Sequence, residues 1–326
     1  MFWFYLIIFI VSCLGFYFAG KMVVDGLITV TKFLKLREFV VAFFVMAAAA
    51  SLPNLLVGIS AALRGIPQLS FGDITGNNLA ALTAALAIVA LFAKGGIPAQ
   101  SRTVRTTSFF VMASAILPLI LITDGSLSRI DGILLIFLFI CYISWLFSKE
   151  ERFNKPYNGS NQSLSLTKGF VFFLKDVFKV FLALIIFIIA SQGMVSSAQF
   201  FAKNFNMSLI LIGILITGLG STIPEIYFGV VSVRRGQNWM ILGDLMGAII
   251  IPSTLVLGLI VLISPIYIYD FSSLALARFF IIVAALFFPI VVKTGRQISK
   301  KEALVLLLIY IVFLVSEILL KEPFFS

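Results

Sequence analysis

Residues 51–76 read SLPNLLVGISAALRGIPQLSFGDITG, and residues 222–247 read TIPEIYFGVVSVRRGQNWMILGDLMG. A shift of 171 residues aligns the two stretches without a gap. From Pro53 to Gly76, seven of the 24 positions are identical, where ordinary residue frequencies predict about two. In the first copy these positions are Pro53, Gly58, Arg64, Gly65, Gly72, Asp73 and Gly76. The chain therefore contains an internal repeat, and we expect the two copies to fold alike.

Around this repeat the composition is that of a membrane protein. Of the 326 residues, 61% are apolar and 12% are charged, whereas soluble domains carry about 25% charged residues. This excludes water-soluble globular, disordered and secreted disulfide-rich proteins. Apolar stretches long enough to span a bilayer predict ten helices. They lie near residues 2–30, 38–63, 71–93, 104–122, 130–148, 168–200, 207–233, 240–263, 272–292 and 300–320.

The longest polar stretch divides these ten helices into two sets of five. It runs from Ser148 to Lys168 and has the composition of a solvated linker. The predicted organisation is a first repeat at 1–148, a cytoplasmic linker at 149–167 and a second repeat at 168–326. Because five is odd, the second copy must enter the membrane from the opposite face. The predicted fold is an all-α polytopic membrane protein, with ten transmembrane helices as two inverted five-helix repeats, as in secondary transporters.

The basic residues predict the orientation, because positive loops remain on the cytoplasmic side. With both termini outside, the inner loops hold 16 basic residues and the outer loops and tail hold five. The inner residues are Lys32, Lys35, Arg37, Lys94, Arg102, Arg105, Lys149, Arg152, Lys155, Lys168, Arg234, Arg235, Lys293, Arg296, Lys300 and Lys301. The outer ones are Arg64, Arg129, Lys203, Arg278 and Lys321. The bilayer thus accounts for the net charge of +10, and no nucleic-acid partner is predicted.

The residue types that the sequence lacks exclude several kinds of metal and catalytic site. The chain has no histidine, which excludes imidazole metal ligands, histidine proton relays and Ser–His–Asp triads. Its two cysteines, Cys13 and Cys141, lie in separate apolar stretches without the spacing of a redox or zinc motif. No enzymatic activity and no cofactor are predicted.

The repeat places a proline and polar side chains near the middle of two predicted helices, at Ser51–Asn54 and Thr222–Glu225. A proline inside a helix frees a backbone carbonyl, and the adjacent hydroxyls, amide and carboxylate are further oxygen ligands for Na⁺, Ca²⁺ or a proton. A carboxylate in mid-membrane costs roughly 2.5–3.5 kcal/mol to insert, so Glu225 is the leading candidate for an ion ligand. The alternatives are a simple proline kink, and a structural ion pair between Glu225 and a lysine of another helix.

Asp73 and Asp244 open the third and eighth predicted helices within glycine-rich segments. Two interpretations remain open. Each aspartate either caps the N-terminus of its helix or belongs to the ion pathway, with Asp73 toward the outside and Asp244 toward the inside. The glycine pairs Gly72/Gly76 and Gly243/Gly247 have the spacing that lets two helix backbones approach closely.

Taken together, these motifs resemble the cation/calcium exchanger superfamily, and in particular its prokaryotic sodium/calcium exchanger-like members. The resemblance rests on Ser/Thr-x-Pro-Asn/Glu followed about twenty residues later by Gly-Asp-x-x-Gly, once in each half. It implies a prokaryotic plasma membrane and a central ion site that includes Gly218, Ser221, Thr222 and Glu225. From the first half it implies Ala47, Ser51, Asn54 and Asn77, although Asn54 stands where the family has a glutamate. Ala50, Ala81, Ala248 and Pro252 also depart from the family's polar residues.

The function implied is a secondary cation antiporter that works by alternating access, with Ca²⁺, Na⁺ or H⁺ as its transported ions. Because Glu225 supplies one charge and Asn54 none, Ca²⁺/Na⁺ exchange needs a second acid, for which Asp73 and Asp244 are the candidates. Otherwise the exchanger is monovalent or proton-coupled. The missing ligands also leave open a membrane protein that binds partners without transporting ions. A channel or a membrane enzyme is the remaining class. The sequence does not predict an oligomeric state.

Overall fold

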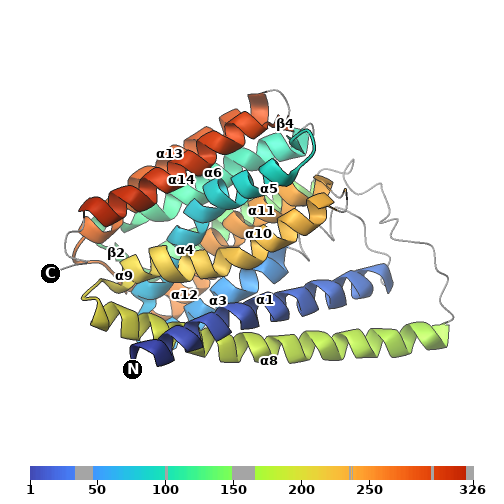
Figure 1. Ribbon diagram of the computed structural model, residues 1–326, viewed down its shortest axis with the longest axis horizontal. Helices are drawn as coiled ribbons and strands as arrows, with labels where there is room; N and C mark the ends of the chain where they lie inside the picture. The colour runs from blue at the N-terminus through green and yellow to red at the C-terminus, as the bar shows by residue number, and fades with distance from the viewer. Residues whose placement is uncertain are drawn as a thin grey trace.

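The computed structural model describes residues 1–33, 47–99, 102–148, 166–234, 236, 238–294 and 297–320. Helices account for almost all of it (Figure 1). In the first half they are α1 (Phe2–Phe33), α3 (Ala47–Leu63), α4 (Pro67–Ala80), η2 (Ala81–Ala85), α5 (Leu86–Phe92), α6 (Arg102–Leu121), η3 (Ile122–Asp124) and α7 (Arg129–Phe147). In the second half they are α8 (Leu166–Asn204), α9 (Leu209–Ile212), η5 (Gly213–Thr217), α10 (Gly218–Arg234), α11 (Asn238–Ile251), η6 (Pro252–Val256), α12 (Leu257–Ile263), α13 (Ser272–Lys293) and α14 (Lys300–Leu320). Strands β1 (Ile97–Pro98), β2 (Ser126–Leu127), β3 (Ile266–Tyr267) and β4 (Gln297–Ile298) are two residues each.

Within the described residues, nine helical segments are long and apolar enough to cross a membrane. A further apolar helix, Ala47–Leu63, is shorter. It belongs to the predicted second span, 38–63, whose first nine residues lie outside the described part of the chain. Most of the predicted linker, at 149–165, also lies outside it, and α8 begins at Leu166. The apolar stretches therefore mark an all-helical membrane protein.

Helix boundaries recur at the offset seen in the sequence. α3 and α10 end 171 residues apart, and so do α4 and α11, while η2 and η6, and α5 and α12, both begin and end at this offset. The turns that follow α3 and α10 also correspond, because Gly65 and Gly236 have φ values of 72° and 71°. Only glycine adopts this left-handed conformation without strain, which explains why both copies carry a glycine there.

Local capping fixes two further corresponding helices. Ser128 precedes α7, and its hydroxyl accepts a hydrogen bond from the backbone N–H of Asp131, whose carboxylate in turn accepts from the backbone N–H of Ser128. Ser299 and Glu302 form the same reciprocal pair at the start of α14. Each capping box satisfies two backbone donors that the first turn of a helix leaves free. The two boxes therefore define where α7 and α14 begin.

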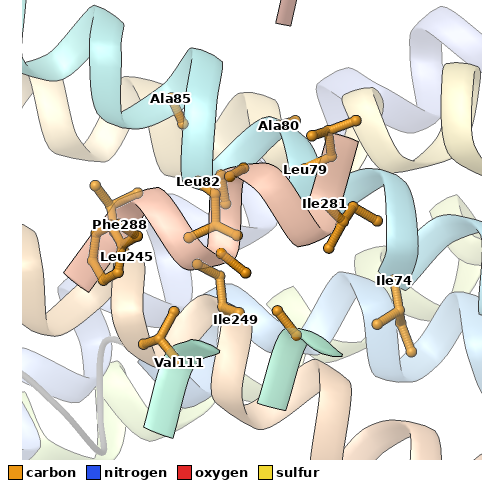
Figure 2. Close-up of a cluster of buried hydrophobic side chains, with 14 of the residues drawn as sticks. Ile74, Leu79, Ala80, Leu82, Ala85, Val111, Leu245, Ile249, Ile281 and Phe288 are labelled. Carbon is orange, nitrogen blue, oxygen red and sulfur yellow. The ribbon is translucent and has the colours of Figure 1, made fainter. Parts of the chain in front are cut away.

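The helices pack around two separate hydrophobic cores. The larger lies among α4, η2, α6, α11 and α13, and its buried side chains include Ile74, Leu82, Leu245, Ile249 and Phe288 (Figure 2). The smaller lies mainly between α1 and α8, which run antiparallel along one side of the bundle (Figure 1). There the start of α1 meets the end of α8 through the ring contacts of Phe2 with Phe201 and Phe205. The smaller core thus packs α1 against α8 and extends to α3 through Ala49, Val57 and Ala61.

Two short strand pairs mark the two ends of the bundle. β1 pairs with β4, and β2 pairs with β3, both antiparallel. Each pair joins a loop of the first half to a loop of the second, and the pairs lie at opposite ends of the molecule in Figure 1. α4 contacts β3, whereas α11 contacts β1. The corresponding helices α4 and α11 therefore start from opposite ends of the bundle.

Candidate ion-binding site

Four glycines bring α4 and the η5–α10 segment into backbone contact. A Cβ atom added to Gly72 would meet the carbonyl oxygen of Ile210, and one added to Gly76 would meet that of Ile214. From the opposite side, a Cβ on Gly218 would lie 2.8 Å from the backbone nitrogen of Asn77. One on Gly213 would lie 2.7 Å from the backbone nitrogen of Asp73. The small residues thus let polar groups of α4 face those of α10 directly.

The prolines of the repeated motif do not interrupt their helices. Pro53 lies inside α3 and Pro224 inside α10, and both helices continue through them. The expected breaks are therefore local: each proline lacks an N–H, so the carbonyls four residues earlier, of Ala49 and Gly220, lose their helical donor. Actual departures from α-helical geometry lie elsewhere, in the π-helical turns η2, η5 and η6.

Among the hydroxyl groups predicted for the site, that of Thr222 on α10 reaches α4. The Thr222 hydroxyl lies 2.7 Å from both the carbonyl oxygen of Gly218 and Oδ1 of Asn77. Asn77 Nδ2 donates to the carbonyl oxygen of Ala248 over 3.3 Å. On α3, the Ser51 hydroxyl donates to the carbonyl oxygen of Ala47 over 2.8 Å. The structure thus links Gly218, Thr222 and Asn77 in one hydrogen-bonded network across α4 and α10.

Glu225 and Asn54 are buried without hydrogen-bond partners. Glu225 is 1% exposed and Asn54 is not exposed, yet both carboxylate oxygens and both amide atoms lack a partner among the described residues. The only ion pair in that part of the chain joins Lys179 to Asp176 at 2.7 Å. A structural lysine partner for Glu225, one of the two alternatives, is therefore not found in the described part of the chain. An isolated buried carboxylate is costly unless something binds to it.

Asp73 and Asp244 lie inside their helices rather than at the ends. α4 begins at Pro67 with Ile66 as its N-cap, so Asp73 is the seventh helical residue and does not cap it. Asp244 is likewise the seventh residue of α11. The capping interpretation fails because both aspartates lie well inside their helices, α4 starting four residues and α11 two residues earlier than predicted. Asp73 and Asp244 are 1% and 2% exposed, and both are close enough to Glu225 for their charges to repel its carboxylate.

Sequence reasoning missed several residues beside this site. Thr217, the last residue of η5, donates to the carbonyl oxygen of Gly213 over 3.1 Å, close to the predicted Ser221, whose hydroxyl lies 3.4 Å from Oδ1 of Asp73. Asn78 Nδ2 donates to the Ser253 hydroxyl at 2.7 Å. Thr83 and Thr254, themselves 171 residues apart, donate to the carbonyls of Leu79 and Ile250. The offset would have paired Thr83 with Thr254, but nothing in the apolar segments around them predicts a π-helical turn.

The arrangement offers oxygen atoms and negative charge, which suits hard cations. Among the described residues, no three acidic or cysteine side chains lie close enough together to hold a metal ion as a cluster. The acids are thus spread along the bundle, while the hydroxyls and freed carbonyls lie between them. Buried acids without partners inside membrane-spanning helices, such as Glu225 in the described part of the chain, are typical of proteins that transport cations or protons.

Comparison with known proteins identifies the family. The model of the sodium/calcium exchanger protein family matches residues 4–148 and 176–319, so the chain belongs to that family. It is therefore an integral membrane protein and a secondary cation antiporter, not an enzyme. This confirms the predicted superfamily.

Similar proteins come from bacteria and archaea. The inner membrane protein YrbG of Escherichia coli is 25% identical over 240 residues, which cover 69% of this chain and 70% of that protein. The sodium/calcium exchanger MaX1 of Methanosarcina acetivorans is 25% identical over 343 residues, which cover 94% of this chain and 97% of that protein. Among solved structures, the sodium-calcium exchanger NCX_Mj soaked with Na⁺ and Sr²⁺ matches with a TM-score of 0.67. The match covers 97% of this chain and 99% of the solved chain at 20% sequence identity. The similarity in structure establishes the fold.

Proposed function

We propose that this antiporter exchanges Ca²⁺ or Na⁺ by alternating access at a midplane site centred on Glu225. The observation that carries the proposal is the pair of buried polar groups without partners, the Glu225 carboxylate and the Asn54 amide. Around them the site contains Ala47, Ser51, Asn77, Gly218, Ser221 and Thr222. Glu225 is the ligand that carries charge, the hydroxyls and carbonyls replace the hydration shell of the ion, and Asp73 and Asp244 line the pathway.

The proposal also includes the arrangement of the chain in the membrane. We place the chain in a prokaryotic plasma membrane with both termini outside, as ten helices in two inverted repeats at 1–148 and 168–326. The cytoplasmic linker is 149–167. The recurrence of helix boundaries at one offset supports the repeats. The contacts of α4 with β3 and of α11 with β1 support the inversion, since corresponding helices start from opposite ends.

A second candidate, monovalent or proton-coupled exchange, is favoured by Asn54. This residue is neutral at the position that corresponds to Glu225 at the repeat offset. A central site with one negative charge is balanced by Na⁺ or H⁺, whereas a dehydrated Ca²⁺ would keep an excess positive charge. A transport-inactive binding protein is the remaining alternative.

Flux measurements on Glu225→Gln test the central site. The substitution keeps the size of the side chain and removes its charge, so we expect exchange to be abolished while the protein still folds and inserts. The assay follows radioactive calcium and sodium in proteoliposomes under imposed Na⁺ and H⁺ gradients. Glu302→Gln is the matched control, because Gln also completes the capping box at α14. Full exchange in Glu225→Gln would refute the proposed site. The absence of any flux in the unmodified protein would instead favour the binding protein.

A further inference from the structure

The start of α6 and the end of α13 meet beside the β1–β4 strand pair. Strand β1 leads into α6 and α13 leads into β4, and the two strands pair with each other. From this end the two helices pack along each other (Figure 1). Their ends therefore lie together at the end of the bundle that carries most of the exposed basic residues among those described.

Two basic side chains adjoin Phe109 on this surface. The ammonium group of Lys293 lies over the Phe109 ring, 4.4 Å from the ring centroid. Arg105 precedes Phe109 by four residues, so it projects from the adjacent turn on the same face of α6. An aromatic ring attracts a cation to its face. The structure thus places two positive charges around one aromatic ring.

Neither charge is neutralised by an acid within the described part of the chain. The ion pair found there joins Lys179 to Asp176, and both residues belong to α8. The Nε atom of Arg105 is buried and has no hydrogen-bond partner among the described residues. A buried donor without an acceptor is costly, and phosphate oxygens are among the acceptors that a guanidinium binds best. The surface is therefore suited to a phosphate group.

An exposed apolar face continues from these cations toward the middle of the bundle. On α13, Leu286 and Ile290 precede Lys293 at helical spacing and are exposed. Phe109 of α6 is exposed as well. Leu286 lies about 10 Å along the helix axis from Lys293. In a bilayer such a face contacts acyl chains, so the two cations lie at headgroup level above an acyl-chain surface.

We propose that Arg105, Lys293 and Phe109 form a binding site for an anionic phospholipid, such as phosphatidylglycerol. The phosphate lies between the guanidinium and the ammonium group, and an acyl chain lies along Phe109, Ile290 and Leu286. A zwitterionic headgroup brings a positive charge of its own, which two fixed cations repel, whereas phosphatidylglycerol carries only the negative phosphate. The inference is independent of the central site at Glu225.

Native mass spectrometry of the purified full-length protein in detergent tests this site. The protein is titrated with phosphatidylglycerol or with phosphatidylcholine of the same acyl chains. We expect the protein to retain one phosphatidylglycerol molecule more tightly than any phosphatidylcholine. Lys293→Gln and Arg105→Gln nearly keep the size of the side chain and remove one charge, and each should weaken that retention about fivefold.

Lys301→Gln is the matched control. It removes the same charge at the same end of the bundle, from an exposed position on α14. It should retain phosphatidylglycerol like the unmodified protein. A loss in Lys301→Gln as large as in Lys293→Gln would show that general positive charge attracts the lipid, and would overturn the site. Equal retention of the two lipids by the unmodified protein would overturn it as well.

Phe109→Leu and inorganic phosphate provide two further tests. Leucine keeps the surface apolar but removes the ring beneath the Lys293 ammonium group, so retention of phosphatidylglycerol should weaken while that of phosphatidylcholine does not change. Unchanged retention in this variant would contradict the proposed arrangement. Inorganic phosphate should not displace the lipid. Displacement that depends on Lys293 would assign the site to a soluble anion instead. Exchange by Glu225→Gln bears only on the central site, so the two proposals fail separately.

Discussion

At the scale of single residues, the contrast between Asn54 and Glu225 determines the charge of the central site. Both side chains are buried, both follow a proline inside a helix, and neither has a hydrogen-bond partner among the described residues. An amide oxygen can coordinate a cation, but it does not offset the charge of the ion. Ion selectivity at this site therefore depends on which acids other than Glu225 contribute charge.

Asn54→Glu should shift the central site toward divalent cations. The new carboxylate would lie on α3, which contacts α10, and in a poorly solvated site a second negative charge favours a divalent ion strongly. We expect Ca²⁺ affinity to rise by about tenfold or more, as measured by calorimetry. Asn204→Glu adds the same charge at an exposed position and should change nothing. Tight Ca²⁺ binding by the unmodified protein, with no gain in Asn54→Glu, would show that a second acid already serves the ion.

At the scale of the helices, close packing of α4 against η5 and α10 positions most of the site. Gly72 and Gly76 of one segment meet Gly213 and Gly218 of the other, backbone against backbone. Because nothing separates the helices, Asp73 and Asn77 reach Ser221 and Thr222 directly. A side chain at this contact would separate the ligands as well as strain the packing.

Gly76→Ala should therefore destabilise the protein and weaken ion binding together. The added Cβ would collide with backbone atoms of Ile214, which cannot rotate away. Overpacking of this kind costs about 1–3 kcal/mol. We expect a lower melting temperature in detergent and a weaker stabilisation by added Na⁺ or Ca²⁺. Gly20→Ala is the control, because the nearest atom to its Cβ would be 4.0 Å away. Equal melting temperatures for the two variants would mean that the helix contact is looser than described.

The helices also show which features a sequence can predict. The offset of 171 residues predicted corresponding elements, and η2 with η6, and α5 with α12, follow it from end to end. The start of α4 was predicted too late, at residue 71, although Pro67 occupies the first helical position, where proline is common. That error alone made Asp73 look like a cap. The π-helical turns were missed because all five residues of Ala81–Ala85 are buried, so the segment shows no amphipathic periodicity.

The sequence predicts candidate residues for the site but not the contacts between them. A lone acid in an apolar helix makes Glu225 a candidate, because the cost of burying its charge is visible in the sequence. The sequence does not show which residues of different helices come into contact. The Asp73–Ser221 contact joins residues 148 positions apart and depends on glycines in both segments. Thr217 was overlooked for the same reason, since a threonine in an apolar helix usually bonds to its own backbone.

At the scale of the whole molecule, charge differs between the two ends of the bundle. Near the β1–β4 pair, Lys94, Arg234, Lys293, Lys300 and Lys301 are exposed. Near the β2–β3 pair, Arg64, Arg129 and Lys203 are exposed among the described residues. The excess of basic residues is expected on the cytoplasmic side of a membrane protein. This distribution agrees with the proposed orientation, in which the β1–β4 end faces inward.

Cysteine labelling of intact cells tests that orientation. In a variant without Cys13 and Cys141, we introduce Tyr269→Cys beside β3, where the side chain is 94% exposed, or Lys301→Cys beside β4. A membrane-impermeant maleimide should label position 269 in intact cells and position 301 only after the membrane is disrupted. Labelling in the reverse order would place both termini inside. The disrupted sample serves as the control that both positions react.

The strand pairs that join the two halves also constrain the order in which the protein assembles during synthesis. β1 and β2 pair only with β4 and β3, which are synthesised much later. During translation the first half therefore enters the membrane with open loops, and Asp73 and Asn77 precede Ser221 and Thr222. Until α10 arrives, those polar groups need water or another protein, because lipid cannot satisfy them. We therefore expect the membrane-insertion machinery to shield the first half until the second half is synthesised. A chain whose translation stops before α10 would then be prone to misassembly.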